Sequence, residues 1–218
     1  MFLINKIYKK NKTLSFLFKL SNADRIFYDF SKKNWQKNPN KKIKGEVLTD
    51  LLFEDMYIFQ LSYIVNFFYK NYDLTPTYYH LIPREKFLLR FLFSTLKKFT
   101  RIHKLFFSFG SDFAFGQKKF KKSKLILNSL QFNSKNELLD YQIDGTRIGD
   151  LIYDSYLRTY QLPTVELSDK RLYQMILNAL DVYFSCEEYL ETHNVKKVVL
   201  SHAVYINYGI LARVALKK

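Results

Sequence analysis

Residues 196–218 read KKVVLSHAVYINYGILARVALKK, and this stretch carries the clearest sign of the fold class. Lys196 to Leu200 predicts a short buried parallel strand, and Gly209 to Lys218 has the spacing of an amphipathic helix. Ser201 to Tyr208 turns the chain between them. A strand that leads through a loop into a helix is the repeating unit of a parallel α/β sheet. Because no further strand follows, we expect this chain to be the front part of a larger α/β protein.

The same alternation of strands and helices runs back to Gly45. Short apolar runs predict strands, and apolar residues at three- and four-residue steps predict helices. The predicted strands are Glu46 to Leu52, Thr77 to Ile82 and Leu105 to Phe109. Helices are predicted for Phe53 to Tyr72 and Arg84 to Arg101, and two more lie within Phe120 to Leu139. A further helix follows the two glycines in Asp144 to Tyr160, and a long one begins at the possible caps Ser168 and Asp169 and runs to about Asn194. The expected fold is α/β and helix-rich, an incomplete Rossmann-like parallel sheet flanked by helices.

The first 44 residues read as a basic N-terminal arm and linker, and residues 45–218 as the Rossmann-like domain. From Met1 to about Phe30, apolar residues recur among lysines. This pattern fits a basic helix on a membrane or partner, and equally a helix that packs on the domain. The following SKKNWQKNPNKKIKG, which ends at Gly45, is polar, basic and without apolar periodicity, so it reads as a linker.

Composition excludes several protein classes. Hydrophobic residues make up 48% of the 218 residues, which excludes a disordered chain. Six glycines and four prolines are too few for the many tight turns of an all-β sandwich or barrel. The single cysteine, Cys186, permits neither an intrachain disulfide nor a thiolate zinc cluster and indicates a reducing compartment. The N-terminus lacks a signal-peptide pattern, and the longest apolar segment is too short to span a bilayer. We therefore expect a cytoplasmic protein.

The net charge of +15 favours phosphates, nucleic acid or anionic lipid head groups. Lysine drift on solvated surfaces, from AT-biased codon usage, explains such a surplus equally well. QKKFKKSK, from Gln117 to Lys124, is the best anion-binding patch, and a solvated helix face is its default interpretation.

Two segments concentrate candidate functional residues. Ser201 and His202 follow a predicted parallel strand, where ligands bind in open α/β sheets, and His202 could act as a general base. A histidine that caps the next helix is the competing explanation. In DGTRIGDLIYDSYLR, Gly145 and Gly149 permit close backbone approach or positive φ, and Asp150 and Asp154 share a helix face. Ordinary capping by Asp150 is the alternative there.

These two segments together resemble a known family. DGTRIGDLIYDSYLR (Asp144 to Arg158) and VLSHAVYINYGILARVALK (Val199 to Lys217) resemble the N-terminal half of bacterial capsule or lipopolysaccharide glycosyltransferase-like proteins of the GT-B type. The matching positions are Gly145, Ile148, Gly149, Asp150, Leu151, Ile152, Tyr153, Asp154, Tyr156, Leu157, Arg158, Ser201, His202, Tyr205, Gly209, Ala212 and Arg213.

The resemblance implies the acceptor-side half of a two-domain glycosyltransferase that builds a cell-surface polysaccharide on the cytoplasmic face of the inner membrane. Its partners are then a saccharide or lipid-linked acceptor, a nucleotide-sugar donor bound by a further C-terminal domain, and an anionic membrane surface. No metal or other cofactor is expected, and this chain alone should lack turnover. His202, Asp150 and Asp154 take catalytic roles; the expected substrate-binding residues are Gly145, Gly149, Tyr153, Arg158, Ser201, Tyr205, Gly209 and Arg213.

Two other functions stay open. The basic run could make the chain a nucleic-acid-binding module, whose affinity would fall steeply with salt. The chain could also be a non-catalytic assembly protein derived from the enzyme half, which binds a partner and no sugar nucleotide.

Overall fold

The computed structural model describes residues 18–35, 37–51, 54–81 and 99–218. Within them the chain forms an α/β fold with a four-stranded, all-parallel sheet flanked by helices. The strand order is β3-β2-β1-β6, which is the order of the first strands of a Rossmann-like sheet. The predicted fold class is therefore confirmed. The sheet strands are β1 (Gly45–Asp50), β2 (Leu74–His80), β3 (Asp112–Gly116) and β6 (Val195–Val199).

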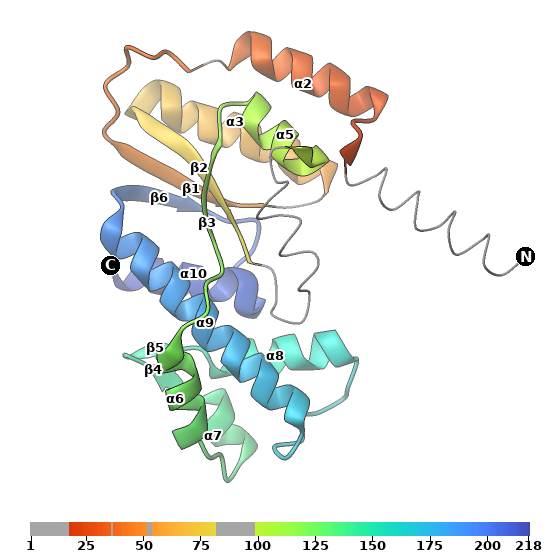
Figure 1. The fold of residues 1–218 in the computed structure, drawn as a ribbon, viewed down its shortest axis with the longest axis vertical. Helices are drawn as coiled ribbons and strands as arrows, with labels where there is room; N and C mark the ends of the chain where they lie inside the picture. Colours follow the sequence, from red (N-terminus) through yellow and green to blue (C-terminus); the bar gives the residue numbers. More distant parts are fainter. Residues whose placement is uncertain (1–17, 36, 52–53, 82–98) are drawn as a thin grey trace, which may run out of the picture. The chain divides into compact units, whose positions relative to one another are not determined.

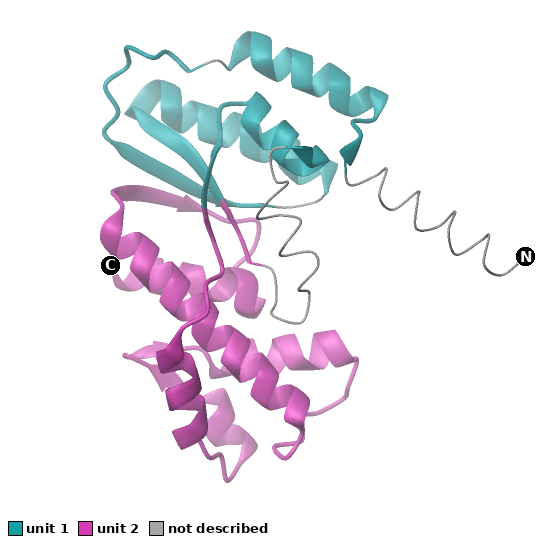
Figure 2. Cartoon of the chain, in the orientation of Figure 1, with its two compact units in different colours: residues 1–78, 85–114 teal, residues 79–84, 115–218 magenta. Residues whose placement is uncertain are grey.

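The chain divides into two compact units, coloured separately in Figure 2. Unit 1 comprises residues 1–78 and 85–114, and unit 2 comprises residues 79–84 and 115–218. Helix α2, which belongs to the predicted arm of residues 1–44, lies in the same unit as β1.

Unit 1 is built around helix α3 (Asp55–Tyr72), with α2 (Asn22–Asn34) and α5 (Arg101–Ser108) in the same unit (Figure 1). Ser21 and Asp24 form a capping box at the start of α2. α3 buries Ile58, Leu61 and Val65, which recur at helical spacing. Trp35 is also buried, with Phe27, Phe30, Tyr63 and Phe109 around its ring in edge-on contacts.

Unit 2 is built around the long helix α9 (Lys170–Thr192), which begins at the Asp169 cap as predicted. A short antiparallel hairpin, β4 (Gln142–Ile143) and β5 (Thr146–Arg147), leads into α8. A π-helical turn, η2, precedes the last helix. Strand β6 also belongs to this unit, and its other helices are α6 (Lys121–Ser129), α7 (Lys135–Leu139), α8 (Gly149–Tyr160), η2 (Tyr205–Gly209) and α10 (Ile210–Lys217).

Three sequence predictions are wrong. Leu105 to Phe109, predicted as a strand, belongs largely to helix α5, and the strand β3 comes just after it. The predicted linker begins inside α2 and contains the buried Trp35. β6 is half-exposed, with Lys196 and Lys197 at the surface, because it is an edge strand. Most of the predicted Arg84 to Arg101 helix and the start of the arm lie outside the described residues.

Candidate functional site

The two segments that carry the family resemblance pack against each other in unit 2. The Arg213 guanidinium meets the Asp150 carboxylate with both ends, Nη1–Oδ1 at 2.6 Å and Nη2–Oδ2 at 2.7 Å. One helical turn further along α8, the Ile206 backbone N–H donates to Ser155 Oγ at 2.9 Å. The chain after β6 is thus anchored to α8, although these residues lie more than fifty positions apart in sequence.

Close packing explains why glycine is required at two of the predicted site positions, Gly149 and Gly209. A Cβ on Gly149 would overlap the Leu138 carbonyl oxygen, and a Cβ on Gly209 would lie 2.5 Å from Leu151 Cδ2. Gly145 is different, because it has a φ of +74° in the β4–β5 turn and open space around its missing Cβ. Helix contact at Gly149 and Gly209 and turn geometry at Gly145 therefore account for the three glycines, and no bound ligand is needed to explain them.

His202 lies in the loop that follows β6, and its ring is held on two sides. Its Nδ1 is 2.8 Å from Ser201 Oγ, and its ring centre is 4.0 Å from that of Tyr208. The ring of Tyr205 stands edge-on to it at 6.4 Å. A half-buried imidazole in a fixed orientation beyond the carboxyl end of a parallel strand is suited to proton transfer with a bound hydroxyl.

The backbone beside His202 is strained. Tyr205 has a φ of +60°, in the left-handed region that bulky side chains rarely adopt. It also begins the π-helical turn η2, and such turns are frequent at functional sites. Strain of this kind costs about 1–3 kcal/mol and persists only where surrounding contacts impose it. The Ile206 bond to Ser155 and the Tyr79 hydroxyl, which donates to the Asn207 carbonyl at 3.2 Å, supply those contacts.

Arg158 supplies positive charge next to this loop. Its guanidinium lies 4.6 Å from the centre of the Tyr205 ring, and its side chain is exposed. It forms no ion pair with any residue that the structure describes. The Tyr153 hydroxyl oxygen lies 3.5 Å from that of Thr164, which does not belong to the His202 loop.

Asp150 and Arg213 neutralise each other. Burial raises the pKa of Asp150, but the hydrogen bonds and charge of Arg213 outweigh burial and leave that pKa below its ordinary value. The Arg213 pKa is raised, first by the hydrogen bonds that its guanidinium donates to Asp150. Asp154 is exposed one turn along α8, and its charge adds to this effect on Arg213. Asp150 is therefore better placed to fix α10 on α8 than to accept a substrate proton.

Replacing Asp150 should show the acid sensitivity of this pair. The pKa of Asp150 in the folded chain lies below the value of about 3.9 that an aspartate has in an unfolded chain. The ionised carboxylate therefore stabilises the fold above about pH 3.9, and this stabilisation is lost as the pH falls through the folded pKa. In urea unfolding we expect Asp150→Asn to cost about 1–2 kcal/mol at pH 7 and progressively less towards pH 3. Asp154→Asn is the matched control and should change stability little. A cost for Asp150→Asn that does not depend on pH would contradict this interpretation.

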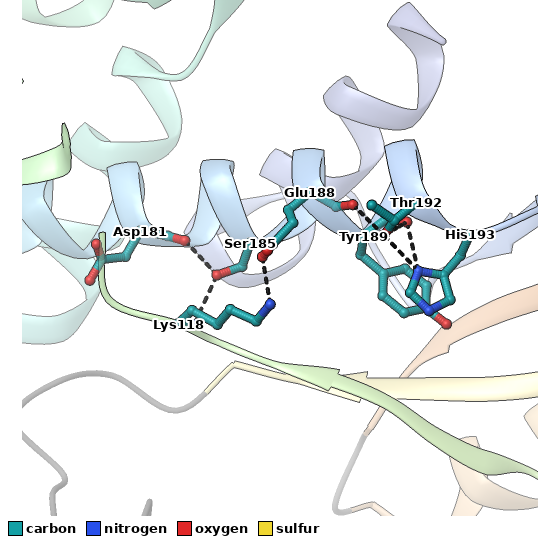
Figure 3. Close-up of polar contacts among 7 residues, drawn as sticks. All are labelled: Lys118, Asp181, Ser185, Glu188, Tyr189, Thr192 and His193. Carbon is teal, nitrogen blue, oxygen red and sulfur yellow. Dashed lines mark hydrogen bonds and ion pairs between the residues drawn. The ribbon is translucent and has the colours of Figure 1, made fainter. Parts of the chain in front are cut away.

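Two lysines of the basic run, Lys118 and Lys122, contact side chains of α9. The Lys118 backbone N–H donates to Ser185 Oγ at 2.9 Å, and Lys118 Nζ lies 2.6 Å from Glu188 Oε2 (Figure 3). Lys122 lies 3.5 Å from the centre of the Phe184 ring and 3.9 Å from Glu187. These contacts neutralise part of the charge on which a nucleic-acid site would depend.

Sequence reasoning missed a stack of aromatic rings in unit 2. Tyr79, Phe115, Tyr189 and His193 follow one another with interplanar angles of 11°, 25° and 14°. His193 ends the stack and is exposed. The positions of Tyr189 and His193, one helical turn apart, were the only signal for it in the sequence.

The hydrogen bonds around His193 determine its tautomer. Nδ1 lies 2.9 Å from Thr192 Oγ1 and 3.2 Å from the Tyr189 carbonyl oxygen (Figure 3). The Thr192 hydroxyl donates its one proton to the Glu188 carbonyl at 2.7 Å, so both partners of Nδ1 act as acceptors. We therefore expect neutral His193 to carry its proton on Nδ1. Nitrogen-15 NMR of the ring checks this, and a proton on Nε2 would contradict it.

Metal-ion and thiolate chemistry have less support in the described residues. Among the described residues, no three His, Cys, Asp or Glu side chains gather to hold a metal ion. Cys186 is buried, and burial raises the pKa of its thiol, which disfavours a reactive thiolate. No helix within the described ranges is long and apolar enough to cross a membrane.

Comparison with known proteins identifies no relative of the chain. The chain matches no family model, no curated protein and no solved structure. Its function must therefore be inferred from the residues and contacts described above.

Proposed function

We propose that this chain is the acceptor-side part of a GT-B glycosyltransferase that acts in bacterial cell-surface polysaccharide synthesis. The observation that carries the proposal is the packing of residues 144–158 against residues 199–217, through Asp150–Arg213, Ser155–Ile206 and Arg158–Tyr205. These two segments carry the family resemblance, and a shared site gives them a reason to occur together. The parallel sheet and its strand order agree with such a domain.

In the proposed reaction, His202 is the general base. It takes the proton of an acceptor hydroxyl while that oxygen forms a bond to the anomeric carbon of the donor sugar. The bond from the anomeric carbon to the nucleotide phosphate breaks, and the nucleoside diphosphate leaves. Ser201 and Tyr208 hold the imidazole, so that little reorientation is needed during proton transfer.

Arg158 is the proposed contact for an anionic group of the acceptor, a phosphate or a sugar carboxylate. Its charge is not neutralised by a described carboxylate, whereas that of Arg213 is neutralised by Asp150. A guanidinium suits such oxygens because its planar fork donates two parallel hydrogen bonds. Within this proposal Asp150 and Arg213 position the loop, and Asp154 stays a solvent-facing candidate for orienting the sugar.

Sugar transfer by the chain, produced together with any sequence that follows it in its gene, tests the proposal. We expect His202→Ala to lower kcat about 10²–10⁴-fold. His193→Ala is the matched control, because that histidine is exposed and belongs to the aromatic stack, and we expect it to change kcat little.

The variants separate the possible results. Undiminished kcat in His202→Ala would remove this histidine from the mechanism. Arg158→Gln should raise KM for an anionic acceptor more than it lowers kcat. Binding of an acceptor without any transfer would favour the non-catalytic assembly protein instead.

A further inference from the structure

The exposed side of helix α3 is mostly apolar, with Gln60 as the exposed polar residue between Met56 and Phe67, which is unusual for a helix at a protein surface. Between Met56 and Tyr69 the sequence contains no charged residue. One half of the helix is buried, and the opposite half carries Met56, Tyr63 and Phe67 at positions that fall on one line, with exposed fractions of 69%, 59% and 53%. A helix that needed only to cover its own core would carry polar side chains on this second half.

Helix α2 of the same unit continues the apolar surface. Its Ile26 and Phe30 are exposed and one turn apart. The ring of Phe30 contacts Trp35 at 5.3 Å, and Trp35 contacts Tyr63 of α3 at 4.9 Å. The side chains of the two helices therefore form one patch, defined here as Ile26, Phe30, Met56, Phe59, Tyr63 and Phe67. A continuous apolar patch of this kind marks an interaction surface.

Basic side chains accompany the patch. Arg25, Lys32 and Lys33 are exposed on α2, and Lys70 is exposed at the end of α3. Against them, Asp29 of α2 and Glu54 at the N-cap of α3 are exposed acids, and Asp55 at the start of α3 is paired with Arg101. The chain as a whole carries a charge of +15. This charge opposes association with a second copy and favours an anionic partner.

We propose that this patch docks the chain on an anionic lipid bilayer. Aromatic side chains suit the boundary between acyl chains and head groups, and Tyr63 of the patch has an apolar ring and a hydroxyl that can stay wet. Each lysine or arginine near an anionic surface adds about fivefold to binding, so the flanking residues of α2 strengthen the attachment. The contact differs from the proposed transferase site and does not depend on that activity.

Vesicle flotation with the whole chain tests the docking surface. We expect the chain to bind vesicles with about 30% phosphatidylglycerol, and to bind vesicles of phosphatidylcholine alone more weakly. Binding should weaken as the salt concentration rises, because salt screens the attraction between the basic residues and the anionic lipids. Phe67→Glu should lower the partition coefficient about tenfold or more, since it removes an aromatic ring from the patch and adds a like charge.

Leu125→Glu is the matched control, because Leu125 is 70% exposed on α6 of the other unit. We expect it to bind vesicles as the unchanged chain does. Circular dichroism of Phe67→Glu should show the native helix content, so that lost binding reports the surface and not unfolding. Equal binding by Phe67→Glu and the unchanged chain would overturn the proposal. A second result would also overturn it: the unchanged chain binds no vesicles, light scattering shows it as a dimer, and Phe67→Glu is a monomer. The patch would then join two copies of the chain.

Discussion

Arg101→Met should lower the free energy of unfolding of unit 1 by about 3–5 kcal/mol, because it leaves a buried carboxylate without its partner. Arg101 and Asp24 have exposed side-chain fractions of only 8% and 5%. Arg101 Nε donates to Asp24 Oδ2 at 2.7 Å, and Nη2 also reaches Asp55 Oδ1 at 2.6 Å. Burial raises the pKa of Asp24, and hydrogen bonds from Arg101 and Ser21 overcome that effect and hold the pKa low. Urea unfolding followed by circular dichroism measures the loss.

Two further variants show whether the cost comes from the unpaired charge. Arg25→Met removes an exposed arginine from α2 and should change stability by no more than about 0.5 kcal/mol. Asp24→Asn combined with Arg101→Met removes both charges and should recover at least about 1 kcal/mol of the loss. A cost below about 1 kcal/mol for Arg101→Met alone would mean that the pair adds little to the stability of unit 1.

Gly149→Ala should destabilise unit 2 by more than about 3 kcal/mol or prevent its folding, because a core without free volume cannot accept an extra methyl group there. A Cβ at this position would overlap the Leu138 carbonyl oxygen at the end of α7. Two backbone bonds, from Ile148 and Gly149 N–H to the Tyr141 carbonyl, both at 3.0 Å, hold the start of α8 in that position. Thermal unfolding measures the effect.

Gly145→Ala is the matched control for the packing argument. Gly145 has a φ of +74° and no heavy atom near its missing Cβ, so alanine there should cost only the strain of a left-handed residue, about 1 kcal/mol. Equal losses in the two variants would contradict the view that helix contact, and not chain flexibility, requires glycine at Gly149.

The sequence was most informative where an element buries one side. The apolar positions of α3 and α9 recur at helical spacing, and both helices lie where periodicity predicts them. Leu105 to Phe109 shows the limit of the method. Its residues are nearly all apolar, and a run that is apolar on every side has no period from which to tell a helix from a strand. Trp35 was missed because its neighbours are polar, although one large ring can anchor a segment by itself.

The candidate site could be predicted only in part. The resemblance identified both of its segments, but neither spacing nor composition indicated that Arg213 would reach Asp150 across the fold. Nor could the sequence predict the left-handed backbone of Tyr205, since a tyrosine at positive φ is maintained by contacts such as the Ile206 bond to Ser155. Asp150, Gly149 and Gly209 therefore gain structural explanations, while His202 and Arg158 keep the proposed chemical ones.

An NMR titration of the nitrogen-15-labelled chain with a glycosyl diphosphate that carries a short alkyl chain tests the central claim most directly. The account predicts shifts of the backbone amides from Ser201 to Gly209 and of the Arg158 side-chain Nε, and these shifts should disappear in Arg158→Gln. Unchanged resonances at these positions, or shifts confined to the lysines of residues 117–124, would contradict the proposed acceptor site.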